Sequence, residues 1–120
     1  MTALPGSYAV CRLEANHPLP QWAAGSFVSI TRTNEELSVV CEEGAVPPDV
    51  RAERDWGLLR VEGPIPFEVT GVAAAIAVPL ANAGISVFLI ATFDTDYLLV
   101  KSESYAQAVD ALRASGITIV

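Results

Sequence analysis

Apolar and polar residues alternate in several short runs of the chain, and this two-residue period predicts β-strands. Strands are predicted over residues 8–14, 26–33, 37–42, 57–62 and 97–101. A short polar turn separates 26–33 from 37–42, so these two strands are predicted to form a hairpin. Residues 85–92 are apolar on both alternating faces apart from Ser86 and Thr92, which predicts a central strand covered on both sides.

A longer apolar period predicts a first helix. Val72, Ile76 and Leu80 recur at i, i+4 and i+8 and give one apolar face to a helix over 70–82. Pro79 lies inside this segment and removes one amide donor, so a kink or an early end is predicted there.

A second helix is predicted to begin at Ser104. Ser104 and Gln107 have the spacing of a capping box, in which each side chain accepts a bond from an unpaired N–H group. Gly116 is predicted to end this helix in a left-handed conformation. The last four residues, 117–120, are then predicted to form a short strand.

The chain also contains an internal repeat. WGLLRVEG at 56–63 matches YAVCRLEA at 8–15 with no gap, so that Trp56 falls at the place of Tyr8 and Arg60 at the place of Arg12. The two hairpin sequences that follow, 25–43 and 84–103, are also alike. Similar strands rich in Val and Leu arise by chance as well, so the repeat and chance similarity are both open from these residues alone.

The hairpin turns fix how the two copies differ in length. Asn34 is predicted to correspond to Asp94. These two residues lie farther apart in the sequence than Tyr8 and Trp56 do. The second copy therefore carries about twelve more residues between its first and second strands, which is the length of a helix. The first copy is predicted to be truncated.

The second copy reads strand, helix, strand, strand, helix, strand, which is the ferredoxin-like order βαββαβ. The predicted fold is therefore α+β, with a duplicated unit and an antiparallel sheet covered by helices on one face. We expect a truncated first repeat over 1–53 and a complete second repeat over 54–120.

Composition narrows the function. The chain has 120 residues, 52% of them hydrophobic, and a formal charge of −7, which disfavours binding to nucleic acid or to anionic lipid. No signal peptide and no apolar run long enough to span a bilayer is found, so a cytoplasmic protein is predicted. Cys11 and Cys41 are predicted to be reduced and buried, as small apolar residues.

Residue patterns of known chemistry are missing from the sequence. No phosphate-binding loop, nucleophile elbow or metal-ligand spacing is found, so no catalytic residue, metal or cofactor is predicted. His17 is predicted to be a turn residue rather than a general base. Arg32 lies in an otherwise apolar run, so it either reaches the edge of the sheet or meets an acidic ligand.

The segment TGVAAAIAVPLANAGISVFLIATFDTDYLLV at 70–100 resembles an ACT domain, a small ligand-sensing module. The resemblance is carried by the helix that ends in Leu-Ala-Asn-Ala-Gly, the following Ile-Ser-Val, and a hairpin with an Asp-x-Asp turn. More narrowly, residues 56–100 are similar to tandem ACT-like proteins that include aspartokinase regulatory regions and cytosolic arginine sensors. The first repeat fits this pattern poorly.

The resemblance implies a site for a small molecule, usually an amino acid, where two units meet. Gly84 leaves room for the Ile85 and Ser86 amides to receive a carboxylate, while Asp94 and Asp96 receive an ammonium group. Alternatively, Gly84 only ends a helix and the acidic turn is only solvated. The predicted ligand-binding residues, including equivalents in the first repeat, are Ser26, Phe27, Asn34, Asn82, Gly84, Ile85, Ser86, Asp94 and Asp96.

The predicted function is therefore a non-enzymatic regulatory module that binds an amino acid or a similar metabolite at one site per chain. A homodimer is predicted, together with an unidentified regulated protein. The alternative is a structural or protein-interaction domain that has kept the fold without a ligand. An enzyme is the weakest interpretation, because no titratable residues cluster outside the acidic turns.

Overall fold

The fold is described from a computed structural model, which covers residues 1–66 and 68–120. These residues form an α+β fold, as predicted, in which hydrogen bonds place the strands in the order β2-β3-β1-β4-β6-β5. The strands and α-helices are β1 (Thr2–Leu13), β2 (Ser29–Arg32), β3 (Leu37–Glu42), β4 (Ala52–Arg60), α1 (Val72–Asn82), β5 (Phe88–Ala91), β6 (Asp96–Lys101) and α2 (Tyr105–Ala114).

The chain divides into two compact units. The first unit is Gly6–Trp56, and the second unit combines Met1–Pro5 with Gly57–Val120. Strands β1 and β4 each contribute residues to both units. Two short 3-10 turns, η1 (Glu43–Ala45) and η2 (Ser102–Ser104), follow the hairpin of the first and of the second unit.

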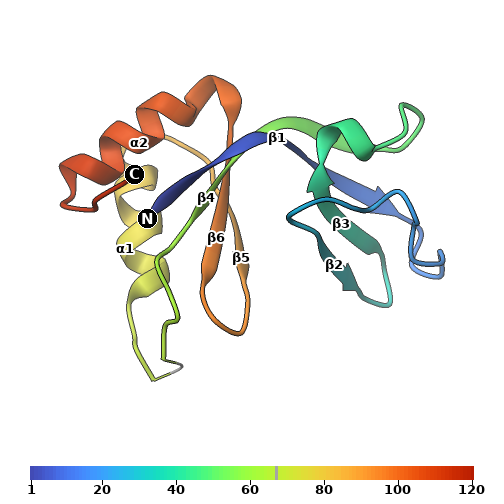
Figure 1. Ribbon diagram of the computed structural model, residues 1–120, viewed down its shortest axis with the longest axis horizontal. Coiled ribbons are helices and arrows are strands. Elements are labelled where there is room, and N and C mark those ends of the chain that lie inside the picture. Colours follow the sequence, from blue (N-terminus) through green and yellow to red (C-terminus); the bar gives the residue numbers. More distant parts are fainter. Residues whose placement is uncertain (67) are drawn as a thin grey trace. The chain divides into compact units, whose positions relative to one another are not determined.

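In the second unit, α1 and α2 cover the same side of β4, β6 and β5, as Figure 1 shows. The buried core between the helices and the strands holds only apolar side chains. It consists of Leu59, Ile76, Leu80, Ile85, Leu98, Val100, Ala108, Leu112 and Ile119. The helices on one face agree with the ferredoxin-like prediction.

Helix α1 follows its predicted apolar face but does not end early. Ile76 and Leu80 are buried on either side of Pro79, and the helix continues to Asn82. A proline in a helix interior costs about 3 kcal/mol, so the packing of these two flanking side chains offsets the lost hydrogen bond. The alternative of an early end at Pro79 is therefore wrong.

Strand β5 is an edge strand, not the central strand that was predicted. It lies last in the strand order and pairs with β6 from Phe88–Leu99 to Ala91–Asp96. Leu89 is 40% exposed. The apolar run at 85–92 therefore leaves apolar surface exposed to solvent. The number of strands that pair with β5 is set by hydrogen bonding and not by the composition of β5 itself.

Helix α2 begins at Tyr105, and the predicted capping box does not form. Ser104 is the N-cap residue but makes no side-chain capping bond, because η2 leads directly into the helix. At the other end, Gly116 takes the predicted left-handed conformation with φ of +100°. The N–H group of Ile117 then donates to the Leu112 carbonyl at 3.1 Å, which closes the helix end.

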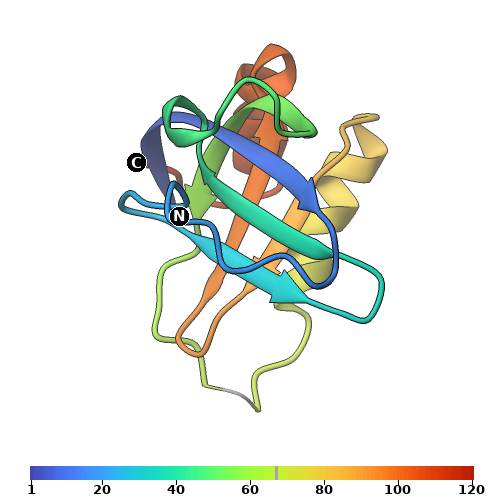
Figure 2. The same cartoon turned by 90° about the vertical axis from the view of Figure 1, so that its right-hand side faces the viewer.

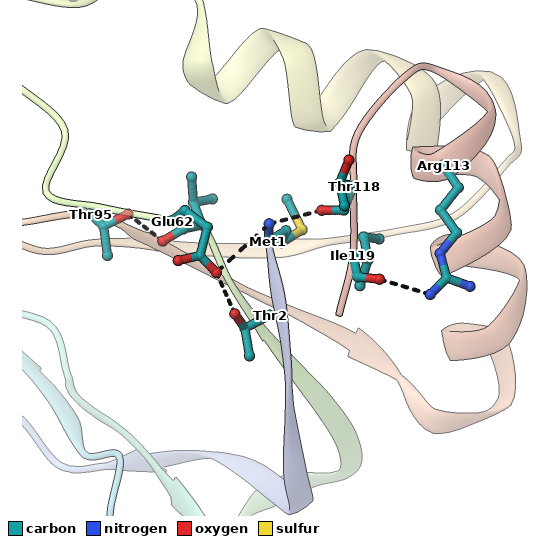
Figure 3. Close-up of polar contacts among 8 residues, drawn as sticks. Met1, Thr2, Glu62, Thr95, Arg113, Thr118 and Ile119 are labelled. Carbon is teal, nitrogen blue, oxygen red and sulfur yellow. Dashed lines mark hydrogen bonds and ion pairs between the residues drawn. The ribbon is translucent and has the colours of Figure 1, made fainter.

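Residues 117–120 form no assigned strand, but their backbone is paired. Val120 donates to the Met1 carbonyl at 3.0 Å and accepts a bond from Ala3 at 2.8 Å, while the Met1 amine donates to the Thr118 carbonyl at 2.8 Å. Figure 3 shows the bond from Met1 to Thr118 together with the hydrogen bond from Thr2 to Glu62. The extended end of the second unit is thus held by backbone hydrogen bonds, as a strand would be.

In the first unit, β3 lies between β1 and β2, as Figure 2 shows. Its described residues form no α-helix. The connections between the strands cover the sheet instead, with Trp22, Val46 and Val50 packed against the strands. The buried core residues are Ala9, Cys11, Leu37, Val39, Cys41 and Val46.

Candidate functional site

A cavity of about 210 Å³ lies in the second unit where three segments meet: the loop after β4, the start of α1 and the turn between β5 and β6. Pockets for drug-sized ligands usually measure ~300–1,000 Å³, so this cavity suits a smaller molecule. It is lined by Ile65, Pro66, Val69, Val72, Ala91, Thr92, Phe93, Asp94, Thr95 and Asp96. A second hollow, of about 380 Å³, shares four of these residues.

The turn between β5 and β6 is held rigidly by its two threonines. The Thr95 N–H group donates to Thr92 Oγ1 at 3.3 Å, and Thr92 Oγ1 donates to the Thr95 carbonyl at 2.8 Å. Thr95 is buried, and its hydroxyl donates to the Val61 carbonyl at 2.8 Å (Figure 3). These bonds fix the backbone between the two acidic residues that face the cavity.

The loop after β4 packs against this turn. The Ile65 N–H group donates to the Asp94 carbonyl at 2.6 Å. Gly63 allows the approach, because a Cβ atom there would lie 2.9 Å from the Cβ of Thr95 and 3.2 Å from the Asp94 carbonyl oxygen. A residue with a side chain at position 63 would push the loop off the turn.

The beginning of α1 supplies the third wall of the cavity. Gly71 is the N-cap with φ of +81° and offers no capping side chain. The first N–H groups of a helix have no partner within it, and the first intrahelical bond here is from Ala75 to the Gly71 carbonyl at 2.9 Å. Val72, the first helical residue, lines the cavity. The start of α1 and the acidic turn therefore border the same cavity.

The predicted site residues of the second repeat do not all reach this cavity. Asp94 and Asp96 line it, but Asn82, Gly84 and Ser86 lie at the opposite end of β5. At about 3.3 Å per residue, Ser86 and Asp94 are separated by roughly 25 Å of extended chain. One small amino acid does not bridge that length within a single chain.

The predicted role of Ile85 is also corrected. Its side chain is buried in the core of the second unit, and its N–H group donates to the Leu80 carbonyl at 2.9 Å. This bond closes the end of α1, as helix ends with a left-handed glycine commonly do. The Ile85 amide is therefore already used and does not receive a carboxylate.

The predicted residues of the first repeat are occupied within their own unit. Ser26 Oγ donates to Glu42 Oε1 at 3.1 Å, and Phe27 packs edge-on against Tyr8 with 6.2 Å between ring centroids. Asn34 is exposed in the turn between β2 and β3.

The two hairpins correspond with Thr33 at the place of Thr92, which differs from the predicted alignment by a single position. The same alignment places the start of β2 on that of β5, β3 on β6, and η1 on η2. Thr33 repeats the bonds of Thr92, since its N–H group donates to the Glu36 carbonyl at 2.9 Å and its Oγ1 accepts from the Glu36 amide at 3.1 Å. Asn34 therefore corresponds to Phe93 rather than to Asp94.

Several residues of the cavity were missed by the sequence analysis. Gly63 to Pro66 were interpreted only as a turn, and the apolar residues before α1 carry no recognisable motif. Two signals were present in the sequence. Gly71 precedes the helix without a capping side chain, and a threonine opens the turn of both hairpins.

The remaining polar candidates have structural roles. The Arg32 guanidinium donates to the carbonyls of Ala15 and His17, so it reaches the edge of the sheet and fastens the connection after β1. Cys11 and Cys41 are free and buried, as predicted. Burial, and the neighbouring Cys41, raise the pKa of the Cys11 thiol to about 11, which keeps it neutral and unreactive.

In residues 1–66 and 68–120, no group of three or more His, Cys, Asp and Glu side chains is placed to hold a metal ion. None of the helices in that part of the chain is long and apolar enough to cross a membrane.

In the second unit, two helices cover one face of the sheet (Figure 1) and a cavity lies at the start of the first helix. The family model described as ACT domain matches residues 51–114, and a separate model of an N-terminal domain matches residues 6–49. The first match spans more than half of the chain. The chain therefore belongs to the ACT domain family, as the sequence resemblance implied.

Known proteins give the same assignment. The bovine cytosolic arginine sensor for mTORC1 subunit 1 is 29% identical over 105 residues, which cover 78% of this chain and 32% of the sensor. The chain thus spans about a third of the length of this relative. Protein Atu0741 from Agrobacterium tumefaciens has a TM-score of 0.94 at 41% identity, covering 99% of this chain and 90% of that one.

A more distant likeness shows the fold alone. The regulatory subunit of aspartate kinase from Thermus thermophilus has a TM-score of 0.64 at 14% identity, covering 93% of each chain. The chain is thus an ACT domain protein related to an arginine sensor, with the fold of aspartate kinase regulatory subunits.

Proposed function

We propose that the chain is a non-enzymatic regulatory module that binds an amino acid in the cavity of the second unit. The observation that carries this proposal is the pairing of two acidic residues, Asp94 and Asp96, with the open start of α1 around one cavity of amino-acid size. An amino acid has one positive and one negative group close together, which is the charge pattern that these two walls complement.

The proposed ligand lies with its carboxylate toward the first turn of α1 and its positive group toward the acidic turn. Unpaired N–H groups and the helix dipole favour an anion at a helix start, as the Val72 end of α1 provides. Carboxylates bind ammonium or guanidinium groups through charge-assisted hydrogen bonds. The name of the bovine relative makes arginine the first ligand to test.

We propose further that the active form is a homodimer that pairs through β5. Residues 69–93 contain no charged side chain, although the chain carries a net charge of −7, so this face lets two copies approach without repulsion. Val78 and Leu89 are exposed on this segment, and β5 is the last strand in the order. Exposed edge strands readily pair with another chain.

Such pairing would also bring together the two groups of predicted site residues, which lie at opposite ends of β5. If β5 pairs antiparallel with its copy about its own centre, the partner subunit's Ser86 comes beside Phe93 of the first copy. Asn82, Gly84 and Ser86 would then contribute to the cavity of the partner rather than to that of their own chain. This places the ligand where two ACT units meet.

The first unit is proposed to be a truncated ACT-like repeat, over about 1–53, followed by the ACT domain over 54–120. A single alignment relates both strands of one hairpin to both strands of the other, which supports a common origin. We propose that the module works in the cytoplasm and transmits ligand binding to a regulated protein, as the name of the bovine sensor suggests.

A second candidate function is a protein-interaction domain that keeps the fold without a ligand. It is favoured by the exposure of Phe93, at 78%, and of Val69, at 49%, on the rim of the same cavity. Exposed apolar side chains that cluster at one place often mark a surface that contacts another protein.

Thermal melting of the purified protein with each of the twenty amino acids tests the proposal. A ligand at a hundred times its dissociation constant stabilises the native state by about 2.7 kcal/mol, which raises the melting temperature of a small domain by roughly 10 °C. Asp96→Asn and Asp94→Asn should fold and lose this shift. Asp110→Asn, an exposed acid on α2, is the matched control and should keep it.

The contrary outcomes are as specific. A hit that survives both Asp94→Asn and Asp96→Asn would place the ligand away from the cavity. No hit among the amino acids, arginine included, would contradict the sensor and favour the interaction domain.

A further inference from the structure

The two units contain equivalent corners just before their hairpins. In the alignment that places Thr33 on Thr92, Gly25 corresponds to Gly84 and Ser26 to Ile85. Both glycines have positive φ angles, +124° at Gly25 and +73° at Gly84, which residues with a side chain rarely adopt. The corners differ in what their amide groups bind.

In the second unit, the residue after the glycine bonds to a helix. The Ile85 N–H group donates to the Leu80 carbonyl at the end of α1. The first unit has no helix before its corner, so Ser26 has no such carbonyl within reach. A backbone N–H group without a protein partner must otherwise remain in water.

In the first unit, Glu42 accepts the bond that a helix carbonyl accepts in the second unit. Its Oε1 atom accepts bonds from Ser26 Oγ at 3.1 Å and from the Ser26 N–H group at 3.5 Å. Gly25 makes room for this carboxylate, because a Cβ atom at position 25 would lie 2.7 Å from Glu42 Cδ and 2.8 Å from Oε2. The carboxylate therefore lies in the space that a side chain at residue 25 would fill.

We propose that the Gly25–Ser26 corner is a carboxylate-binding site whose occupant is Glu42 of the same chain. The corner offers a hydroxyl and an amide donor to one oxygen, and a glycine that lets an anion approach the backbone, which is how turns of the main chain bind anions. Glu42 is the last residue of β3, so the tethered carboxylate outcompetes free carboxylates in solution.

The equivalent corner of the second unit lacks such an occupant. Nothing lies within 4 Å of a Cβ atom added at Gly84, and the residue that corresponds to Glu42 is Lys101. An acid that fills the corner in one unit is thus replaced by a base in the other. This last step rests on the proposed function: the corner of the first unit is filled by its own carboxylate and is not open to a second ligand.

Acetate is the probe for this proposal, with the amide signal of Ser26 in a ¹⁵N-labelled NMR spectrum as the readout. In the wild-type chain, acetate should leave the Ser26 amide unmoved, because Glu42 fills the corner. In Glu42→Ala, acetate should shift the same signal in a saturable way. The apparent dissociation constant for acetate should be at least tenfold lower than for any shift seen in the wild type. Chloride at equal ionic strength should not reproduce the shift.

Three variants make the result specific. Glu42→Gln keeps the shape of the side chain, so the corner stays filled and acetate should not enter. Ser26→Ala combined with Glu42→Ala removes the hydroxyl donor and should abolish acetate binding. Glu35→Ala, which removes an exposed acid from the far end of the hairpin, is the matched control and should behave as the wild type.

A Ser26 amide that does not respond to acetate in Glu42→Ala would overturn the proposal, as would an equal response in wild type and variant. If Glu42→Ala does not fold, Glu42→Gln carries the test: loss of the charge should move the Ser26 amide signal, and an unmoved signal would contradict the corner. The thermal screen with amino acids is independent of this result, so failure of the proposed sensor and failure of the corner are told apart.

Discussion

The two units carry the same hairpin, and in the second unit a cavity lies beside the turn of that hairpin. Both turns are closed by a threonine with the same hydrogen bonds, at Thr33 and at Thr92. The second unit adds α1, whose open start forms a wall of the cavity, while the first unit has short connections in its place. In the second unit, the hairpin supplies two acidic residues beside the cavity, and the start of α1 supplies another wall.

The difference also shows two ways of covering a sheet. In the second unit, residues of α1 and α2 fill the core, and in the first unit Trp22, Val46 and Val50 from connections do so. The first unit therefore has a core without an α-helix. It lacks the backbone donors that a helix start presents.

The largest expected effect comes from the cores. Leu80→Ala and Leu37→Ala each remove a fully buried leucine, one from each unit, and should each lower the free energy of unfolding by about 2–5 kcal/mol. Urea unfolding measures both losses. Only Leu80→Ala, which loosens α1, should also weaken ligand binding in conditions where the protein remains folded. Equal weakening by Leu37→Ala would break the distinction between the units.

A smaller effect is expected where β4 passes under α2. Gly57 corresponds to Ala9 in the repeat, but a Cβ atom at Gly57 would lie 2.3 Å from the ring of Tyr105, whose hydroxyl bonds to the Leu58 carbonyl. Gly57→Ala should cost about 1–3 kcal/mol through overpacking. Gly44→Ala, with nothing within 4 Å, is the control. A neutral Gly57→Ala in urea unfolding would show that α2 does not need the glycine.

The paired turns should respond alike in stability and differently in binding. Thr33→Val and Thr92→Val remove the same hydroxyl bonds, and each should cost about 0.5–1.5 kcal/mol in thermal unfolding. Only Thr92→Val should reduce the thermal shift caused by the ligand, because Thr92 lines the cavity. A loss of binding in Thr33→Val would move the site toward the first unit.

How far the sequence predicted these features depends on the range of the interaction. Helix α1 with its buried Ile76 and Leu80 was predicted, because it depends on local periodicity. The repeat with a truncated first copy stays a prediction. The edge position of β5 was not predicted, since an apolar run does not reveal how many neighbours a strand has. The ends of β5 were likewise treated as one site, although Ser86 and Asp94 lie at opposite ends of the strand.

The small error in aligning the turns has a local cause. The polar triplets at 34–36 and 94–96 suggested one alignment, while the threonine bonds that fix the turns place Glu35, and not Asn34, at the position of Asp94. Hydrogen bonds of a turn depend on the backbone, which similar side chains do not report. The role of Ile85 was missed for the same reason, since the bond to Leu80 is made by its backbone.

A further expected effect is a dependence of stability on alkaline pH to which Cys11 of the first unit contributes. Burial raises the pKa of the Cys11 thiol from 9.0 to about 11, so the neutral thiol is favoured in the folded state. Its contribution is complete below pH 9 and is lost as the pH rises from about 9 to 11, because the unfolded chain ionises first. Residue 59, at the equivalent place in the second repeat, is a leucine and does not titrate.

Urea unfolding under reducing conditions from pH 8 to pH 10.5 measures this dependence. Cys11→Ala should lower the stability at pH 8 and flatten its decline toward pH 10.5. Parallel curves for wild type and variant would mean that another group causes the decline.

We propose above all that one ligand binds in the second unit, between the acidic turn and the start of α1. Mapping of backbone amide shifts by NMR, with arginine or whichever amino acid raises the melting temperature, tests this binding most directly. We expect saturable shifts at residues 63–66, 69–74 and 91–96, with a further set at 84–86 if the dimer contributes, and no shift at Gly25, Ser26 or Glu42. Shifts centred on residues 25–42, or a saturating ligand that leaves 91–96 unmoved, would contradict binding in the second unit.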